Sequence, residues 1–382
     1  MEFQGFKRQD GSYGVRNHVL VLSSVSCANG VVDALGRAFP EVITLQHAYG
    51  CGYGPEDFST SFRVLTGIIN NPNVGAVLAI GLGCELLKAE YLMQSVQGKP
   101  AESIVIQQMG SKAATEKGME VVGKMLQHIK SQKRESAPVS SLIVGLKCGG
   151  SDAFSGVTAN PSVGAAAELL VIEGGTAVMG EVTEMIGTAH ILRRRCPDQQ
   201  LGEEVAKLII DHEKHVRQSL GELAGLVIAP GNIDGGLSSI VEKSLGCIAK
   251  GGSLPIQELV EYGNKPSRKG LVIMNSPGYD IDCMAGMASG GAQIIIFTTG
   301  RGTPAGFPAV PVIKVSSNTT TFTNMTGDID INAGTILGES KTITEVGRDI
   351  YDLVLRVSGG QPTCAEINKS IPFNCLKVGP TF

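Results

Sequence analysis

The chain has 382 residues, 42% of them hydrophobic and 18% charged, with a formal net charge of −4 and no basic block. This length favours two domains of ordinary size, and this charge argues against a nucleic-acid partner. No run reaches the roughly 20 apolar residues that span a bilayer, and the polar N-terminus lacks the apolar core of a signal peptide, so we expect a cytoplasmic protein.

The first part of the chain alternates short β-rich runs with longer helical patterns, which is typical of a parallel sheet flanked by helices. Its predicted strands are residues 18–25, 41–46, 74–80 and 103–107. Its predicted helices are residues 29–39, 59–69, 85–95 and 111–131. A polar, Pro-containing stretch follows at residues 131–141, and we interpret it as a linker.

A second α/β series begins after this linker. Its predicted strands are residues 142–146, 176–179, 270–275, 293–298 and 310–315. Its predicted helices are residues 162–172, 201–220 and 343–358. A Gly-rich insertion around residues 229–264 is expected to hold a helix between loops. The sequence therefore predicts an α/β protein of two Rossmann-like domains, residues 1–135 and 136–382, with largely parallel sheets flanked by helices.

The nine cysteines, in a chain without an export signal, favour metal ligands, nucleophiles or packing residues over disulfide bonds. Ligands bind beyond the carboxyl ends of parallel strands. Five cysteines fall at such positions: Cys27, Cys51, Cys84, Cys148 and Cys283. One cysteine there would be expected to pack, but five favour a metal site assembled from distant segments; packing or a single redox thiol are the alternatives. The other four are expected to pack: Cys196, Cys247, Cys364 and Cys375.

Three further side chains at the same predicted edge are candidates for acid–base chemistry. His47 lies four residues before Cys51 and is either a buried hydrogen-bonding residue or a general acid or base. Glu181 and Glu184 follow a predicted strand, and they are either carboxylates at a helix N-terminus or a catalytic pair.

Candidate substrate-binding residues come from two loops. Arg301, in TTGRGTPAG, suits bidentate binding of a carboxylate, with a solvated loop arginine as the alternative. Ser151 and Asp152, in CGGSDAFSG, are candidates for hydrogen bonds to a hydroxylated substrate.

Several long motifs resemble the altronate and galactarate dehydratase family, and the resemblance covers essentially the whole chain. The most extensive is LKCGGSDAFSGVTANPSVG at residues 146–164. The others are RQDGSYGVRNHV at 8–19, HAYGCG at 47–52, GLGCE at 81–85, FTTGRGTP at 297–304 and DIDINAGT at 328–335.

This resemblance implies an iron-dependent β-elimination on a hydroxy acid, because the family contains sugar-acid dehydratases and a two-subunit sulfolactate sulfo-lyase. The resemblance implies that full-length members carry a small N-terminal SAF-type domain, and we expect no counterpart of it within this sequence. We therefore expect a separate small SAF-type subunit and a homo- or hetero-oligomer. The HAYGCG and CGGSDAFSG motifs are of the dehydratase type, which favours elimination of water from a sugar acid.

The chemistry of such a dehydration needs a base for the proton on C2 and an acid for the hydroxyl that leaves C3. Fe²⁺, alone or in an iron–sulfur cluster, would serve as the Lewis acid. We expect three or four of Cys51, Cys84, Cys148 and Cys283 to hold it, with Cys27 in reserve. Arg301 would bind the carboxylate, and the predicted base is one of His47, Glu181 and Glu184.

Two rival functions remain open: a sulfolactate sulfo-lyase large subunit, and a non-catalytic subunit that binds a sugar acid. A nucleotide-dependent dehydrogenase is disfavoured because SSVSCANG, and not a GxGxxG turn, follows the first predicted strand.

Overall fold

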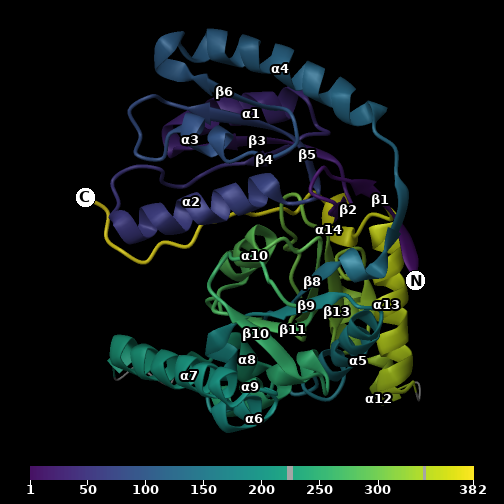
Figure 1. The fold of residues 1–382 in the computed structure, drawn as a ribbon. Coiled ribbons are helices and arrows are strands. Elements are labelled where there is room, and N and C mark those ends of the chain that lie inside the picture. Colours follow the sequence, from purple (N-terminus) through teal and green to yellow (C-terminus); the bar gives the residue numbers. More distant parts are fainter. Residues whose placement is uncertain (222–226, 339–340) are drawn as a thin grey trace.

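The computed structural model describes residues 1–221, 227–338 and 341–382. It is an α/β molecule in which parallel sheets are flanked by helices, as the sequence predicts, with a smaller sheet in the upper half of Figure 1 and a larger one in the lower half. In the described residues, none of the helices combines the length and the apolar character needed to cross a membrane.

The smaller sheet has the strand order β4-β3-β5-β6, and all its strand pairs are parallel. Its strands are β3 (His18–Ser23), β4 (Ile43–Leu45), β5 (Val74–Gly81) and β6 (Ala101–Val105). Its helices are α1 (Asn29–Ala38), α2 (Pro55–Asn70), α3 (Ala89–Gln94) and α4 (Ser111–Ser131). The central strand β5 is buried along its whole length, which explains its unbroken run of small and apolar residues.

The larger sheet has seven parallel strands in the order β10-β11-β9-β8-β12-β13-β14. These are β8 (Ile143–Cys148), β9 (Thr176–Met179), β10 (Ile256–Val260), β11 (Gly270–Met274), β12 (Ile294–Thr299), β13 (Val312–Ser316) and β14 (Ile331–Asn332). The strand β8 lies in the middle, so its carboxyl end opens at the centre of the sheet edge.

The longer helices around this sheet are α5 (Ala159–Ile172), α7 (Gln199–Leu220), α10 (Asp280–Ser289) and α13 (Ile343–Ser358). The shorter ones are α6 (Ala189–Arg194), α8 (Pro230–Asp234), α9 (Ile240–Cys247), α11 (Thr319–Asn324), α12 (Thr335–Gly338) and α14 (Cys364–Ile367). A capping box formed by Thr342 and Glu345 begins α13. This helix packs closely on α5 at Gly347. A Cβ at that position would lie only 2.6 Å from the side chain of Ala165, so a larger residue would push the two helices apart.

Three segments differ from the sequence prediction. The predicted linker contains β7 (Glu135–Pro138), which pairs antiparallel with β1 (Glu2–Lys7); β1 also pairs with β2 (Tyr13–Gly14). The Gly-rich insertion contributes two helices, α8 and α9, and the edge strand β10. The segment after β11 forms α10, whose residues 281–289 are all buried, so it lacks the amphipathic pattern that reveals a surface helix.

The two sheets share one continuous apolar core. Residues of α2 and β5 pack in it together with residues of α10 and β11. Two buried asparagines before β5 add polar links across this interface. The side chain of Asn71 donates to the carbonyls of Ala288 and Ala292, both at 2.9 Å.

Asn73 uses its whole amide group at the same interface. Its oxygen accepts from the backbone N–H of Val15 at 2.9 Å and of Arg16 at 3.3 Å. Its nitrogen donates to the carbonyls of Gln293 and Ala309, both at 2.9 Å. The side chain is fully buried, so four backbone groups of distant segments depend on one amide.

Replacing this amide tests how much it stabilises the interface. The variant Asn73→Ala should lower the free energy of unfolding by about 2–5 kcal/mol, because buried N–H and C=O groups lose their partners. Urea denaturation followed by circular dichroism measures the change. The control Asn324→Ala, at an exposed position of α11, should leave the midpoint within about 0.5 kcal/mol. An equal, small effect of both variants would contradict this interpretation.

Candidate active site

Two polar side chains end the central strand of the larger sheet. Lys147 and Cys148 are the last residues of β8, between β9 and β12, and both are buried. A buried lysine needs an anionic partner close by, since an isolated charge in a protein core is strongly disfavoured. The neighbouring strand supplies that partner.

Glu181 lies just beyond β9 and forms a buried ion network with two lysines. Its carboxylate accepts from the ammonium groups of Lys147 and Lys250, the second at 2.7 Å, and all three side chains have 0% exposure. It also accepts from the backbone N–H of Cys148 at 2.9 Å. Glu181 has φ 69°, which few non-glycine residues adopt, and these bonds hold it there. We call these residues the Lys147–Glu181–Lys250 triad.

A second carboxylate, Glu184, meets two thiols beside the triad. Its Oε2 lies 2.5 Å from Sγ of Cys148 and 3.2 Å from Sγ of Cys247, and the two sulfurs are 3.3 Å apart. One donor atom from each of Cys148, Glu181, Glu184 and Cys247 lies within 4.8 Å of all the others. We call these four residues the thiol–carboxylate cluster. Two sulfurs and carboxylate oxygens form a donor set that suits Fe²⁺ or Zn²⁺.

The surrounding lysines set the charge of this cluster. Burial alone would raise the pKa of Glu184, but Lys243, together with Lys147 and Lys250, lowers it to about 2. Burial and the hydrogen bond with Cys148 raise the pKa of the Cys247 thiol well above its ordinary value. These directions favour an ionised Glu184 and a protonated Cys247 at neutral pH, so a metal bound by Cys247 would have to displace that proton.

Lys147 carries a positive charge despite its burial. Burial lowers its pKa, but the negative charges of Glu181 and Asp280 raise the pKa by more than burial lowers it. The pKa of Lys147 therefore lies well above its ordinary value. Asp280 begins α10, and its carboxylate lies 2.8 Å from Nζ of Lys147. The triad and Asp280 thus fix the ends of β8, β9 and α10 relative to one another.

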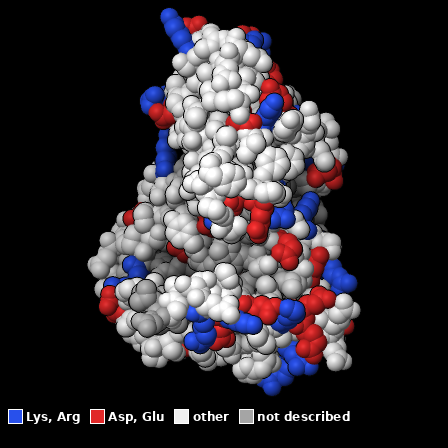
Figure 2. Space-filling view, turned by 90° about the vertical axis from the view of Figure 1, so that its left-hand side faces the viewer, with Lys and Arg blue, Asp and Glu red and all other residues white. Residues whose placement is uncertain are grey.

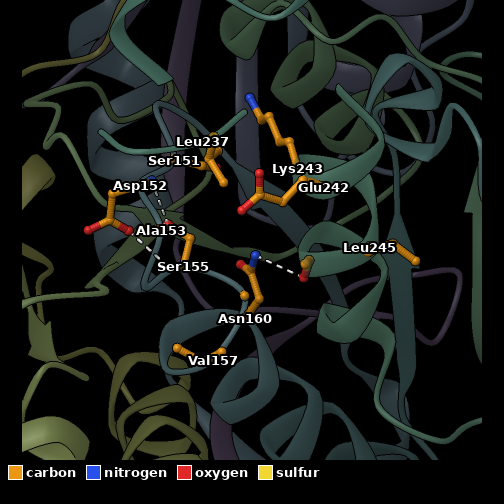
Figure 3. A pocket seen from close by; sticks show the side chains of 12 residues that line it. Ser151, Asp152, Ala153, Ser155, Val157, Asn160, Leu237, Glu242, Lys243 and Leu245 are labelled. Carbon is orange, nitrogen blue, oxygen red and sulfur yellow. Dashed lines mark hydrogen bonds between the residues drawn. The ribbon is translucent and has the colours of Figure 1, made fainter. Parts of the chain in front are cut away.

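A cavity of about 280 Å³ opens next to the cluster. Figure 3 shows Ser151, Asp152 and Ser155 on one side and Glu242 and Lys243 on the other. The ammonium group of Lys243 lies 2.7 Å from Oε1 of Glu184. Lys243 therefore lines the cavity and contacts the cluster.

The loop that follows β8 is fixed by Asp152. Its carboxylate accepts from the hydroxyls of Ser155 and Ser317, at 2.7 and 2.6 Å, and from the side-chain amide of Asn318 at 2.9 Å. Asp152 thus holds the cavity wall against the segment after β13. Ser151 also lines the cavity, and its backbone N–H donates to Asn232 at 2.7 Å.

The predicted ligands of the smaller sheet lie away from this cluster. Cys27, Cys51 and Cys84 are exposed, at the edge where β3, β4 and β5 end. Among the described residues, no second group of three His, Cys, Asp or Glu side chains brings its donor atoms within 4.8 Å. The structure therefore does not bring Cys51, Cys84, Cys148 and Cys283 together, and only Cys148 belongs to a cluster.

Cys283 lies inside α10, because the chain turns into that helix soon after β11. Its thiol is fully buried, 3.4 Å from the hydroxyl of Ser276, and burial raises its pKa to about 12. Arg301 is exposed in the loop after β12, and its backbone N–H donates at 3.0 Å to the carbonyl of Gly150 in the loop after β8.

His47 is buried at the end of β4, with 1% exposure, and burial lowers its pKa to about 4. Its Nδ1 accepts from the backbone N–H of Tyr49 at 3.0 Å. Its Nε2 has no hydrogen-bond partner among the residues that the structure describes.

Sequence reasoning missed four residues of the site: Lys147, Lys243, Cys247 and Lys250. The sequence predicts only a packing role for Cys247. Two signals could have revealed them. A lysine inside the apolar run LIVGLKC demands a buried counter-ion. Lys243, Cys247 and Lys250 are spaced by four and three residues, which places them on one face of a helix.

Comparison with known proteins gives matches over nearly the whole chain. Residues 5–130 match the second domain of D-galactarate dehydratase/altronate hydrolase. Residues 139–381 match the C-terminal domain of D-galactarate/altronate dehydratase.

Three curated proteins are similar along most of their length. Altronate dehydratase of Bacillus subtilis (strain 168) is 34% identical, over 99% of this chain and 78% of that protein. Galactarate dehydratase (L-threo-forming) of Escherichia coli (strain K12) is 37% identical, over 94% of this chain and 73% of that protein. The (2R)-sulfolactate sulfo-lyase subunit beta of Chromohalobacter salexigens is 32% identical, over 95% and 94%.

The variant Glu181→Gln tests the triad. It keeps the side-chain shape but leaves two buried ammonium groups without their shared counter-ion, so it should lower the free energy of unfolding by about 3–5 kcal/mol. Urea denaturation measures this. The matched control is Glu120→Gln on α4, where an exposed carboxylate also lies between two lysines, Lys117 and Lys124, at 3.1 and 2.6 Å. That variant should barely move the midpoint, because solvent screens the pairs. Equal effects would show that burial of the triad is unimportant.

Metal binding is tested with Co²⁺, whose bonds to thiolates give a charge-transfer absorption. Anaerobic titration of the wild-type protein should produce this band, and Cys148→Ser or Cys247→Ser should abolish it. The variants Cys27→Ser, Cys51→Ser and Cys84→Ser should retain it. The opposite pattern would place the metal on the edge of the smaller sheet.

Proposed function

Because the chain belongs to the D-galactarate/altronate dehydratase family, we propose that it is a hydro-lyase that removes water from a sugar acid. The product would be a 2-keto-3-deoxy acid, formed by loss of the proton on C2 and the hydroxyl on C3. The substrate class is proposed from the names of the relatives, which act on altronate or galactarate.

The structural observation that carries this proposal is the position of Lys243. Its side chain lines the cavity of about 280 Å³, and its ammonium group lies 2.7 Å from a carboxylate oxygen of the thiol–carboxylate cluster. A substrate carboxylate bound in the cavity would meet this cation, and its C2–C3 unit would then face the cluster. Small-molecule sites combine apolar lining with a few convergent polar groups, and this cavity has Leu237 and Leu245 as well as polar side chains in its lining.

The donor set of the cluster fits Fe²⁺. We propose that Cys148 and Cys247, with one oxygen of Glu184, would hold it, because soft thiolates favour such metals and Glu184 is already ionised. When bound, the metal would supply Lewis acidity to the leaving hydroxyl. Iron and acid-labile sulfide analysis of protein purified anaerobically would distinguish a mononuclear iron from an iron–sulfur cluster.

The side chains of the protein would bind and orient the acid. Lys243 and the exposed guanidinium of Arg301 offer cationic partners for carboxylates, and a dicarboxylate such as galactarate could use both. Ser151 would bond a substrate hydroxyl from the cavity wall. Asp152 acts indirectly, because its carboxylate already bonds Ser155, Ser317 and Asn318.

The base that removes the C2 proton remains one of the three predicted residues. Both oxygens of Glu181 are engaged by the triad, which suits positioning better than proton transfer. Glu184 is ionised and lies next to Lys243. His47 is neutral, because burial lowers its pKa to about 4. Its Nε2 has no hydrogen-bond partner among the described residues, so this nitrogen could accept a proton.

A sulfolactate sulfo-lyase is the second candidate function. It is supported by the 32% identity to a sulfo-lyase subunit beta over 94% of that protein. Both reactions are β-eliminations next to a carboxylate and differ in the leaving group. That relative is named as one subunit of its enzyme, and we propose a small SAF-type subunit as a partner of this chain as well.

Activity separates these functions. Protein purified anaerobically and supplied with Fe²⁺ should convert altronate or galactarate to a keto acid, and sulfolactate should release no sulfite. Assays with and without an added small SAF-type subunit would show which assembly is active. Sulfite release without keto-acid formation would replace the proposal by its rival.

The variants Cys148→Ser and Cys247→Ser should each lower kcat roughly 100-fold or more, since each removes a proposed ligand. Lys243→Met should lower kcat/KM roughly 10–100-fold through weaker carboxylate binding. The control Cys196→Ser, at a partly buried cysteine on the C-terminal side of α6, should retain activity. Full activity of all four variants would exclude the cluster from catalysis.

A further inference from the structure

A second polar cavity lies at the opposite end of the smaller sheet from its cysteines. It has a volume of about 470 Å³, and its lining includes Lys7, Arg8, Lys99, His128 and Gln132. Gly75, near the start of β5, also borders it, so the cavity lies at the amino ends of β5 and β6. The cluster at Cys148 belongs to the other sheet and to the carboxyl end of its strands.

The lining of this cavity carries three cationic side chains and no carboxylate. Lys7 is exposed at its mouth, whereas Arg8 and Lys99 are partly buried. Neither Arg8 nor Lys99 has a carboxylate oxygen within 4.0 Å in the part of the chain that the structure describes. The carboxylate of Asp10, in the adjoining hollow, bonds the hydroxyl of Ser12 at 2.6 Å. A charge removed from water is normally paired at contact distance, and in the described residues Arg8 and Lys99 have Asp10 as a carboxylate only at longer range.

The two cations are held in place by neutral groups. Lys99 donates to the carbonyls of Ile69 at 3.1 Å and Asn71 at 3.2 Å. Arg8 donates from Nε to the carbonyl of Pro72 at 2.7 Å. Its terminal nitrogens donate to Gln132 at 3.3 Å, to the carbonyl of Arg16 at 3.2 Å and to Asn17 at 3.0 Å.

These contacts leave unused donors on both cations. An ammonium group has three N–H bonds and a guanidinium group has five. Two are used on Lys99 and four on Arg8, so each side chain keeps one N–H for a further acceptor. The cations are therefore positioned before any ligand arrives, which lowers the entropic cost of binding.

The charge state of Lys99 reflects its unpaired environment. Burial, followed by the positive charge of Arg8, lowers its pKa to about 7 against the opposing effect of Asp10. Burial likewise lowers the pKa of Arg8 to about 10. An anion in the cavity would remove this penalty by pairing with both groups.

We propose that this cavity is a binding site for a small oxyanion, a phosphate or carboxylate group on a compact organic molecule. Lys99 and Arg8 bind the anionic group, and Lys7 attracts it at the mouth. The site is independent of the proposed dehydration, since it shares no residue with the cluster or the cavity beside it.

Competitive labelling of lysines tests this site without an activity assay. The wild-type protein is treated with limiting acetic anhydride at pH 7.5, and acetylation of each lysine is followed by mass spectrometry. Inorganic phosphate, glycerol 3-phosphate or glutarate is added in increasing amounts. At least one should slow acetylation of Lys99 about 10-fold in a saturable manner, while exposed Lys112 on α4 is unaffected.

Binding of the same probes is measured by isothermal titration calorimetry. Lys99→Gln should weaken binding roughly 10-fold or more, because it removes a charge-assisted hydrogen bond, and Lys112→Gln should leave it unchanged. If Lys99→Gln does not fold, Lys7→Gln at the exposed mouth takes its place, with a several-fold loss expected. Protection by the two phosphates alone identifies a phosphate site, and protection by glutarate alone a carboxylate site. No saturable protection by any probe overturns the proposal, whatever the enzyme assay shows.

Discussion

The Lys147–Glu181–Lys250 triad is the interaction on which the candidate site depends. It joins the end of β8, the turn after β9 and the helical segment after α9, three places that are remote in the sequence. Two lysine ammonium groups are buried around one carboxylate. Such a buried ion network adds little net stability, because removing the charges from water offsets their attraction. Its role is better understood as positional: it fixes Cys148 through the backbone N–H that bonds Glu181, and it places Glu184 one turn further along the chain.

The site combines a closed part with an open part. The triad and the thiols are shielded from water, which strengthens each electrostatic contact within them. The cavity next to them is reachable, and Lys243 contacts both. Figure 2 shows acidic and basic side chains interspersed on the face that it presents, with no large area of one sign. The substrate-binding role proposed above for Lys243 and Arg301 therefore relies on individual cations and not on the field of the whole molecule.

Much of the fold could be predicted from the sequence because apolar residues recur with the spacing of a helix, or form the short apolar runs of a buried strand, in most of its elements. The helices at 111–131 and 343–358 have the predicted bounds, and the apolar run at 74–80 is the buried strand β5. Elements whose sequence carries no period were missed: α10 is buried all round, and β1 and β7 gain their strand character from pairing with each other. For the candidate site, the sequence singles out the loop after β8 and the two glutamates as candidates, whereas it predicts that Cys247 packs. Its role depends on a helix meeting the turn after β9, and no local pattern of Cys247 itself encodes that meeting.

The helical stretch from Ile240 to Gly251 has a consequence for how this chain can vary. Lys243, Cys247 and Lys250 reach one side of it only because the spacing between them matches the helical repeat. Inserting or deleting one amino acid between them would rotate the later side chains by about 100° and turn a ligand or a counter-ion toward solvent. Homologues that keep this chemistry should therefore show length variation in the surrounding loops, while this segment keeps a constant length.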